Sequence, residues 1–135
     1  MTSVRHLNPK SLLVPPGYTH VVEVTGPGRT VYIAGQVGAD KNGQVAGGAG
    51  DVRAQMVQAF ENLKAALAEV GATFNDVVKI TNYLVDGAHV QDHREIRDRY
   101  VNTAAPPAST LLVVSRLARE GWLFEIDAVA VLPEK

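Results

Sequence analysis

Residues 122–132 of this chain read WLFEIDAVAVL, and the alternation in this stretch decides the fold. In an extended strand its even-numbered residues lie on one face, and all of them are apolar. The odd-numbered residues lie on the other face, where Glu125 and Asp127 interrupt a second set of bulky apolar side chains. We therefore predict a strand over Leu123–Leu132 that needs cover on both faces.

Two segments have the sequence pattern of helices that could supply this cover. The first begins after Asp51, a residue favoured at the N-cap, and ends at Gly71. The second runs roughly from His89 to Tyr100, because Pro106 and Pro107 prevent its continuation. The first helix carries one apolar stripe, formed by Met56, Phe60, Leu63, Leu67 and Val70.

The other β-prone runs complete the set of elements. Residues 21–24 and 30–34 flank a Gly-Pro-Gly turn, and we predict that they pair as an antiparallel hairpin. Residues 35–50 contain many glycines and are predicted to form a loop or an irregular ribbon. Residues 77–85 are predicted to form a central strand, and residues 110–114 a further strand.

These elements predict an α+β fold in one domain, residues 1–135, with two helices packed on one face of a mixed sheet of about six strands. Two helices can cover only one face of such a sheet. The second face must be buried by something else, most simply by another subunit. Glu125 and Asp127 then lie either at the wet edge of that interface or in a site.

Composition argues against several classes of protein. The chain has 13 Lys and Arg against 14 Asp and Glu, with three Phe, one Trp and four Tyr. A nucleic-acid partner is therefore disfavoured, because such binding needs a basic groove with stacking aromatics. The absence of cysteine excludes a disulfide scaffold, a thiol nucleophile and a thiolate metal site. No signal peptide or membrane span is evident, so a cytoplasmic location is expected by default.

Six motifs, in order and at fitting spacings, resemble the YjgF/RidA family over essentially the whole chain. They are PGY at residues 16–18, VYIAGQ at 31–36, AFENL at 59–63, DVVK at 76–79, PAST at 107–110 and FEIDAVA at 124–130. The resemblance implies a homotrimer whose sheets face inward, with small-molecule clefts between subunits and no cofactor. Active members hydrolyse reactive imines and enamines to a keto acid and ammonia.

The resemblance also implies roles for particular residues. The glutamate matching Glu125 positions or activates the hydrolytic water, and the tyrosine matching Tyr18 lines the cleft. The backbone N–H at the Gly35 position, next to Gln36, helps an arginine to hold the substrate carboxylate. In this chain Ser109 replaces that arginine, ahead of Thr110. Because a serine cannot form the bidentate ion pair, the change should cost on the order of 2–4 kcal/mol of binding.

Several candidate residues have two interpretations. Glu125 is either a base acting on water or a carboxylate satisfied by its neighbours, and Asp127 is interpreted as an interface residue. We interpret Ser109 and Thr110 as cleft-lining residues and not as nucleophiles, because no Gly-x-Ser-x-Gly elbow is present. Together with Tyr18 and the Gly35-Gln36 backbone, they form the expected substrate-binding set.

The second helix holds two further candidates. His89 and His93 have the spacing of two metal ligands, but no glutamate follows His89 and no third ligand is evident, so we predict solvated histidines and no metal site. Arg94 either belongs to an ion-paired solvent face or compensates for the arginine that Ser109 replaces.

Three functions remain open from the sequence. The first is a hydrolase acting on C=N bonds, of the imine or enamine deaminase type, with Glu125 as catalytic residue. The second is a non-catalytic ligand-binding or regulatory trimer, suggested by Ser109. The third is the ribonuclease or translation-inhibitor role of some relatives, which ranks last because the chain has a net charge of −1.

Overall fold

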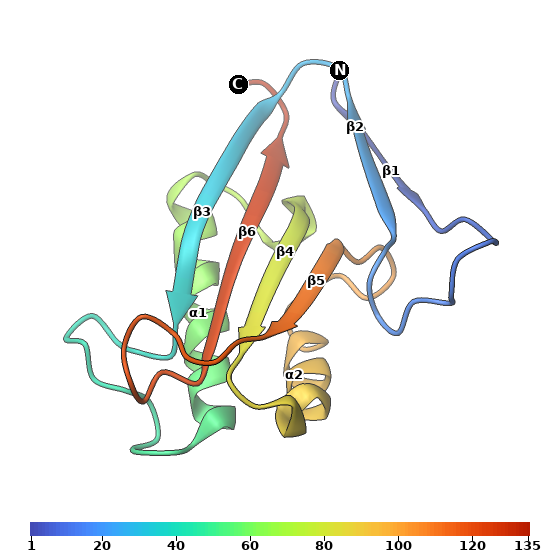
Figure 1. Ribbon diagram of the computed structural model, residues 1–135. Helices are drawn as coiled ribbons and strands as arrows, with labels where there is room; N and C mark the ends of the chain where they lie inside the picture. The colour runs from blue at the N-terminus through green and yellow to red at the C-terminus, as the bar shows by residue number, and fades with distance from the viewer.

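The computed structural model describes residues 1–135, and Figure 1 shows the arrangement of its elements. One-turn 3₁₀ helices precede β4 and α2, at Phe74–Asp76 and Gly87–His89. The strands and α-helices are β1 (Ser3–Leu7), β2 (Val21–Thr25), β3 (Arg29–Val37), α1 (Val52–Glu69), β4 (Val77–Leu84), α2 (Val90–Arg97), β5 (Ala108–Val113) and β6 (Phe124–Leu132).

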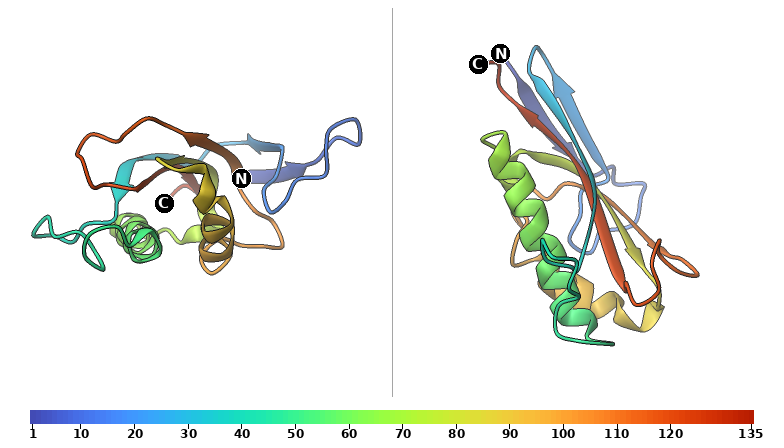
Figure 2. Two further views of the ribbon diagram at one scale, coloured as in Figure 1. Left: turned by 60° about the horizontal axis from the view of Figure 1, so that its bottom comes forward. Right: turned by 90° about the vertical axis from the view of Figure 1, so that its left-hand side faces the viewer.

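The main sheet has four strands in the order β3-β6-β4-β5. β6 pairs antiparallel with β3 on one side and with β4 on the other, and β4 pairs parallel with β5. Both helices pack on the same face of this sheet, as the side view in Figure 2 shows. The predicted α+β class, with two helices on one face of a mixed sheet, is confirmed.

The predicted hairpin between residues 21–24 and 30–34 is wrong. β2 pairs with β1, in a register that runs from Ser3 opposite Thr25 to Leu7 opposite Val21, and β3 pairs with β6. The two-stranded sheet stands beside the main sheet in Figure 1. The Gly-Pro-Gly turn reverses the chain, but a turn signal does not determine which distant strand each arm will join. β1 was absent from the predicted elements.

Helix α1 forms where its caps and apolar stripe predict it. The Asp51 carboxylate accepts a hydrogen bond from the Ala54 backbone N–H at 3.0 Å, which satisfies one of the first-turn donors. After the helix, Gly71 adopts a φ of +77°, the left-handed conformation that only glycine reaches without strain. Both predicted ends of this helix are confirmed.

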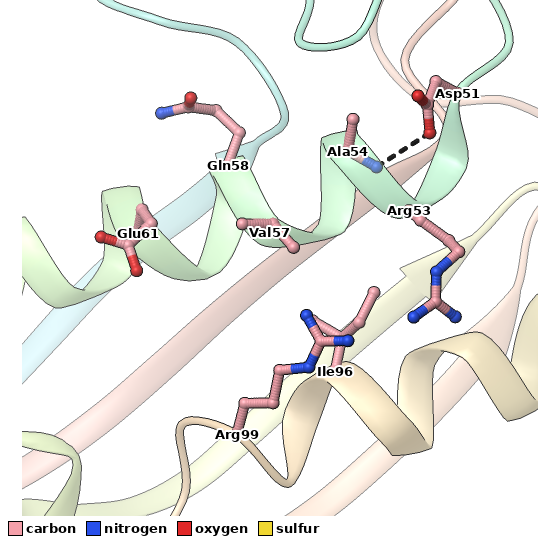
Figure 3. A pocket seen from close by; sticks show the side chains of 8 residues that line it. All are labelled: Asp51, Arg53, Ala54, Val57, Gln58, Glu61, Ile96 and Arg99. Carbon is pink, nitrogen blue, oxygen red and sulfur yellow. Dashed lines mark hydrogen bonds between the residues drawn. The ribbon is translucent and has the colours of Figure 1, made fainter.

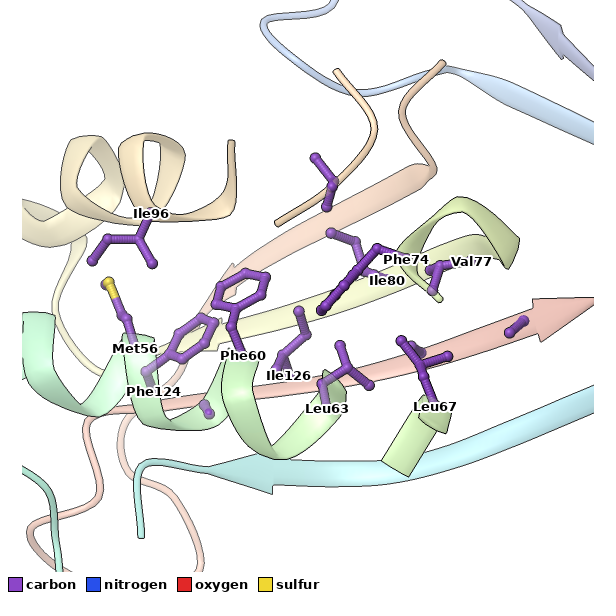
Figure 4. Close-up of a cluster of buried hydrophobic side chains, with 14 of the residues drawn as sticks. Met56, Phe60, Leu63, Leu67, Phe74, Val77, Ile80, Ile96, Phe124 and Ile126 are labelled. Carbon is purple, nitrogen blue, oxygen red and sulfur yellow. The ribbon is translucent and has the colours of Figure 1, made fainter. Parts of the chain in front are cut away.

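The core lies between the helices and the sheet, as shown in Figure 4. The Phe60 ring stacks on Tyr100, at 5.0 Å between centroids, and on Phe124, at 5.9 Å. Ile96 of α2 and Ile126 of β6 are fully buried around this stack. The predicted stripe of α1 is buried at Met56, Phe60, Leu63 and Leu67, while Val70 is partly buried against the same cluster.

The opposite face of the main sheet has no cover within the chain. Tyr32 of β3 is 80% exposed and Leu112 of β5 is 45% exposed. The odd-numbered residues of β6 are all half-buried, whereas its even-numbered residues are buried. The predicted alternation of β6 is therefore confirmed, and Glu125 and Asp127 lie on the uncovered face. No helix combines the length and apolar character that crossing a membrane requires.

Substitution of Phe60 by alanine tests the role of the aromatic stack. We expect Phe60→Ala to lower the free energy of unfolding by about 3–5 kcal/mol, because it removes a large buried side chain that its neighbours cannot replace. Urea denaturation at a fixed protein concentration measures the loss. Lys64→Ala, on the exposed side of α1, is the control and should change stability by less than about 0.5 kcal/mol. Equal stabilities of the two variants would contradict the assignment of the core.

Candidate functional site

Glu125 lies on the uncovered face, directly against β3. A β-carbon placed on Gly35 would lie 2.0 Å from the Glu125 carboxylate oxygen Oε2, so only glycine permits this approach. The strand pairing of β3 and β6 shifts between Ile33 and Gln36, which places Gly35 in the irregular part of the ladder. Gly35 and Glu125 are thus brought together by strand pairing.

The environment of Glu125 suits a group that takes up and releases a proton. Burial raises the pKa of its carboxyl group, and the nearby negative charge of Asp127 adds to this effect. No hydrogen bond from the chain stabilises the ionised form. A carboxylate with a raised pKa and a free oxygen can accept a proton from water more readily than one that is ion-paired.

Other polar groups on the uncovered face are already paired. The Tyr83 hydroxyl donates to Asp127 Oδ2 at 2.9 Å, and this bond raises the pKa of Tyr83. The Lys79 ammonium donates to the Thr110 hydroxyl at 2.7 Å. Thr110 therefore points to the same face as Glu125, but from β5, with Lys79 of β4 beside it.

Ser109 faces the other way, toward the helices. Its register partner on β4 is Ile80, which is buried in the core. Asn82 of β4 donates from Nδ2 to the Ser109 hydroxyl at 3.1 Å and to the Thr110 carbonyl at 3.0 Å. The Asn82 Oδ1 atom lies 2.8 Å from Nε2 of His93 in α2. A chain of hydrogen bonds therefore joins α2, β4 and β5.

The prediction that His93 is a solvated helix residue is wrong. His93 is 1% exposed, and burial together with the charges of Arg97 and Arg94 lowers its pKa to about 4. Because the Asn82 amide nitrogen donates to a carbonyl, its Oδ1 must accept, so Nε2 of His93 carries the proton. The Nδ1 atom of His89 instead lies 3.1 Å from Oδ2 of Asp92. The two histidines thus have different partners despite their metal-ligand spacing.

A small pocket of about 80 Å³ lies between α2 and β5. It brings together Tyr18 and Ser109, two of the expected substrate-binding residues, with His93, Arg94 and Arg97 of α2. Pro16 and Leu111 complete its lining.

Arg97 holds the segment that carries Tyr18. Its guanidinium donates to the Pro16 carbonyl at 3.3 Å and to Asp98 at 3.0 Å, and it is 5% exposed. Gly17 has a φ of +97°, and a β-carbon there would lie 2.0 Å from the guanidinium. Gly17 therefore satisfies two demands at once, a left-handed backbone and close contact with Arg97.

Gly35 and Gln36 lie at the opposite edge of the sheet. They line an open hollow of about 510 Å³, together with Arg119 and Trp122 of the loop before β6. β3 and β5 are the two edge strands of the four-stranded sheet, so three strand spacings, roughly 14 Å, separate them. Within one chain, Gly35, Gln36 and Glu125 are therefore separate from Tyr18 and Ser109, and Thr110 lies on β5 with its side chain on the uncovered face.

The groove between α1 and α2, shown in Figure 3, contains none of the expected site residues. Its volume is about 520 Å³, and most of its lining side chains are charged or polar. Arg53 bridges from α1 to Asp92 at 2.7 Å and to Glu95 at 2.9 Å, and Arg99 also contacts Glu95 at 3.2 Å. The pairs of Arg53 with Asp92 and Glu95 join α1 to α2.

Two functional candidates were missed by the sequence reasoning. Asn82 is fully buried on the core-facing side of β4, and Arg97 is almost fully buried at the end of α2. A buried amide requires polar partners, so an asparagine at a core-facing position of a strand is a signal that could have identified Asn82. Nothing in the local pattern distinguishes Arg97 from the exposed Arg99.

Comparison with known proteins points to one family. The family described as Endoribonuclease L-PSP matches residues 11–132. A RutC family protein of Pyrococcus abyssi is 35% identical over 114 residues, 84% of each chain. A mouse protein named 2-iminobutanoate/2-iminopropanoate deaminase is 38% identical over 115 residues, covering 84% of this chain and 80% of the mouse chain. A crystal structure of a Rid family protein from Yersinia pestis has a TM-score of 0.82 at 34% identity, covering 96% of this chain and 98% of the other.

The buried His93 predicts a pH dependence of stability. Its pKa in the folded protein, about 4, lies below the unfolded value of 6.5, so the folded state binds fewer protons between these values. The corresponding stabilisation, roughly 3 kcal/mol, is complete above pH 6.5 and is lost as the pH falls toward 4. Urea unfolding of the wild type and of His93→Gln from pH 4 to 8 measures it. We expect the free energy of unfolding to fall less between pH 6.5 and 4 in the variant than in the wild type. An equal fall in both proteins would contradict the lowered pKa of His93.

Proposed function

The chain belongs to the Endoribonuclease L-PSP family, also called YjgF/RidA, and on this premise we propose that it hydrolyses reactive imines of small 2-oxo acids in a cleft between subunits. The observation that carries the proposal is the Glu125 carboxylate, which is partly buried, free of hydrogen bonds from the chain and in contact with Gly35. The mouse relative that is named as an imine deaminase supports the choice of substrate class.

A second subunit would complete the site in this proposal. Gly35 lies on the edge strand β3 with Glu125 of β6 against it, while Ser109 lies on the other edge strand, β5, beside Tyr18 and on the helix side. One chain cannot close both groups around a small molecule. A symmetric assembly could bring the first group of one subunit next to the second group of its neighbour.

The uncovered face supports this assembly. Tyr32 and Leu112 are exposed on it, with Val129 lying opposite Tyr32 in the strand pairing. Exposed apolar side chains of this kind are stabilised when another copy removes them from water. We propose the homotrimer with inward-facing sheets that the family resemblance implies.

The proposed reaction needs only a base, a water molecule and a binding site for the substrate. Glu125 takes a proton from water while the water oxygen forms a bond to the imine carbon, and the C=N double bond becomes a single bond. The proton passes to the nitrogen. The hydroxyl of the tetrahedral intermediate then gives its proton to the same nitrogen by way of Glu125, so that the carbonyl forms as the C–N bond breaks and the 2-oxo acid and ammonia are released. No cofactor is needed for this sequence.

A second candidate function is a binding or regulatory trimer without turnover. It is favoured by Ser109, whose hydroxyl is held by the buried Asn82 and lies where the family carries a carboxylate-binding arginine. This candidate keeps both groups of residues but assigns no chemical step to Glu125. The two functions are separated by whether a bound imine is hydrolysed.

Replacement of Glu125 tests the catalytic proposal. We expect Glu125→Gln to lower the hydrolysis of 2-iminopropanoate by about 10²–10⁴-fold, because the amide cannot take a proton from water. The imine is generated in situ by an amino-acid oxidase, and its loss is followed against the uncatalysed background. Glu69→Gln, an exposed carboxylate on α1, is the matched control and should keep the full rate. An unchanged rate in Glu125→Gln would refute the assignment, and no rate in the wild type would favour the second function.

A charge on the uncovered face tests the assembly. We expect light scattering to give the wild type a mass about three times the 14.4 kDa of one chain. Leu112→Glu should lower this mass and abolish hydrolysis, because it places a charge in an apolar interface. Lys64→Glu, on the outer side of α1, should change neither. A wild type that stays monomeric at micromolar concentration would contradict the proposal.

A further inference from the structure

The pocket between α2 and β5 presents hydrogen-bond donors that the rest of the chain does not use. Arg94 is half-buried in its lining, and no carboxylate of the chain lies within ion-pair distance of its guanidinium. The two neighbouring arginines differ, because Arg97 at the end of α2 contacts Asp98 and Pro16, while Arg99 in the following turn contacts Glu95. Arg94 is therefore the cation of this pocket that can receive an external anion.

The orientation of Ser109 follows from the hydrogen-bond chain behind it. One hydrogen of the Asn82 amide donates to the Thr110 carbonyl, and the other donates to the Ser109 oxygen. The Ser109 oxygen thus acts as an acceptor on the buried side, and its own hydrogen has no partner within the chain. It remains free to donate into the pocket that Ser109 lines.

The size and charge of the pocket limit what it can hold. Its volume of about 80 Å³ suits a group of a few heavy atoms, because one water occupies roughly 30 Å³ in the liquid. Its lining contains two arginines and no carboxylate. The same positive charges help to lower the pKa of His93. The pocket thus favours a small anionic group with two acceptor oxygens.

We propose that this pocket binds the carboxylate of the substrate, and that Arg94 of α2 and the Ser109 hydroxyl supply its contacts. This inference rests on the proposed function and names the groups that recognise its substrate. Asn82 acts as a positioning residue, because it orients Ser109 from behind the pocket and is itself bonded to His93. The remainder of the substrate extends out of the pocket, toward Glu125 of a neighbouring subunit.

Calorimetric titration of the full-length protein with pyruvate, the 2-oxo acid product of the proposed reaction, tests the assignment without any turnover. We expect Arg94→Gln to weaken binding by roughly ten- to a hundred-fold, because it removes a charge-assisted contact, and Ser109→Ala by roughly two- to ten-fold. Arg99→Gln, on the same helix but paired with Glu95, is the matched control and should bind as the wild type does. Unchanged binding in Arg94→Gln would overturn the proposal.

A rescue variant separates direct contact from a structural role. In the double variant Arg94→Gln/Ser109→Arg, a guanidinium enters the pocket from β5, and we expect pyruvate binding to recover at least tenfold over Arg94→Gln. Merely structural damage at Arg94 would not be repaired in this way, and a failure to recover while both variants fold would count against the proposal. Circular dichroism and thermal melting report the fold of each variant.

Two further measurements, of phosphate binding and of imine hydrolysis, distinguish a failure of the pocket assignment from a failure of the proposed hydrolysis. Inorganic phosphate that binds through Arg94 as tightly as pyruvate would overturn the assignment to a carboxylate. A wild type that binds pyruvate through Arg94 but does not hydrolyse 2-iminopropanoate would refute the proposed hydrolysis and support the pocket. If the wild type and Arg94→Gln hydrolyse the imine with the same KM, the result would support the proposed hydrolysis and overturn the assignment of the pocket.

Discussion

The pairing of β6 on both of its edges is the constraint on which the rest of the structure depends. β6 is bonded to β3 on one side and to β4 on the other, and its side chains alternate strictly between a buried and a half-buried face. A shift of register by one residue would expose Phe124 and bury Glu125. The core and the candidate site are therefore two faces of one strand, and the same register determines both.

The buried asparagine on β4 is the second organising feature. A fully buried amide without partners would destabilise the fold, but Asn82 bonds to His93 on one side and to β5 on the other. The resulting chain joins α2 to the edge strand that α2 precedes in sequence. Because the Asn82 amide uses both its oxygen and its nitrogen in hydrogen bonds, it holds α2, β4 and β5 together behind the small pocket.

The charges of the chain are separated across the sheet although its net charge is only −1. Glu125 and Asp127 give the uncovered face near β3 an acidic character, whereas Arg94 and Arg97 make the pocket beside β5 basic. An anionic small molecule would be attracted to the second region and repelled by the first. A site that uses both must take them from different copies of the chain, because the sheet itself lies between them.

The sequence by itself determined the elements whose signals are local. The caps and stripe of α1 and the alternation of β6 follow from spacing along the chain, and they predict the α+β class and a face of β6 that carries Glu125, whereas roles for Tyr18, Gly35 and Glu125 follow only from the resemblance of their motifs to the YjgF/RidA family. Tertiary structure alone decided that β2 pairs with β1, that His93 is buried on Asn82 and that Ser109 faces the helices. The physical reason is that periodicity reports which residues share a face. Which distant strand or side chain will lie against that face depends on long-range pairing.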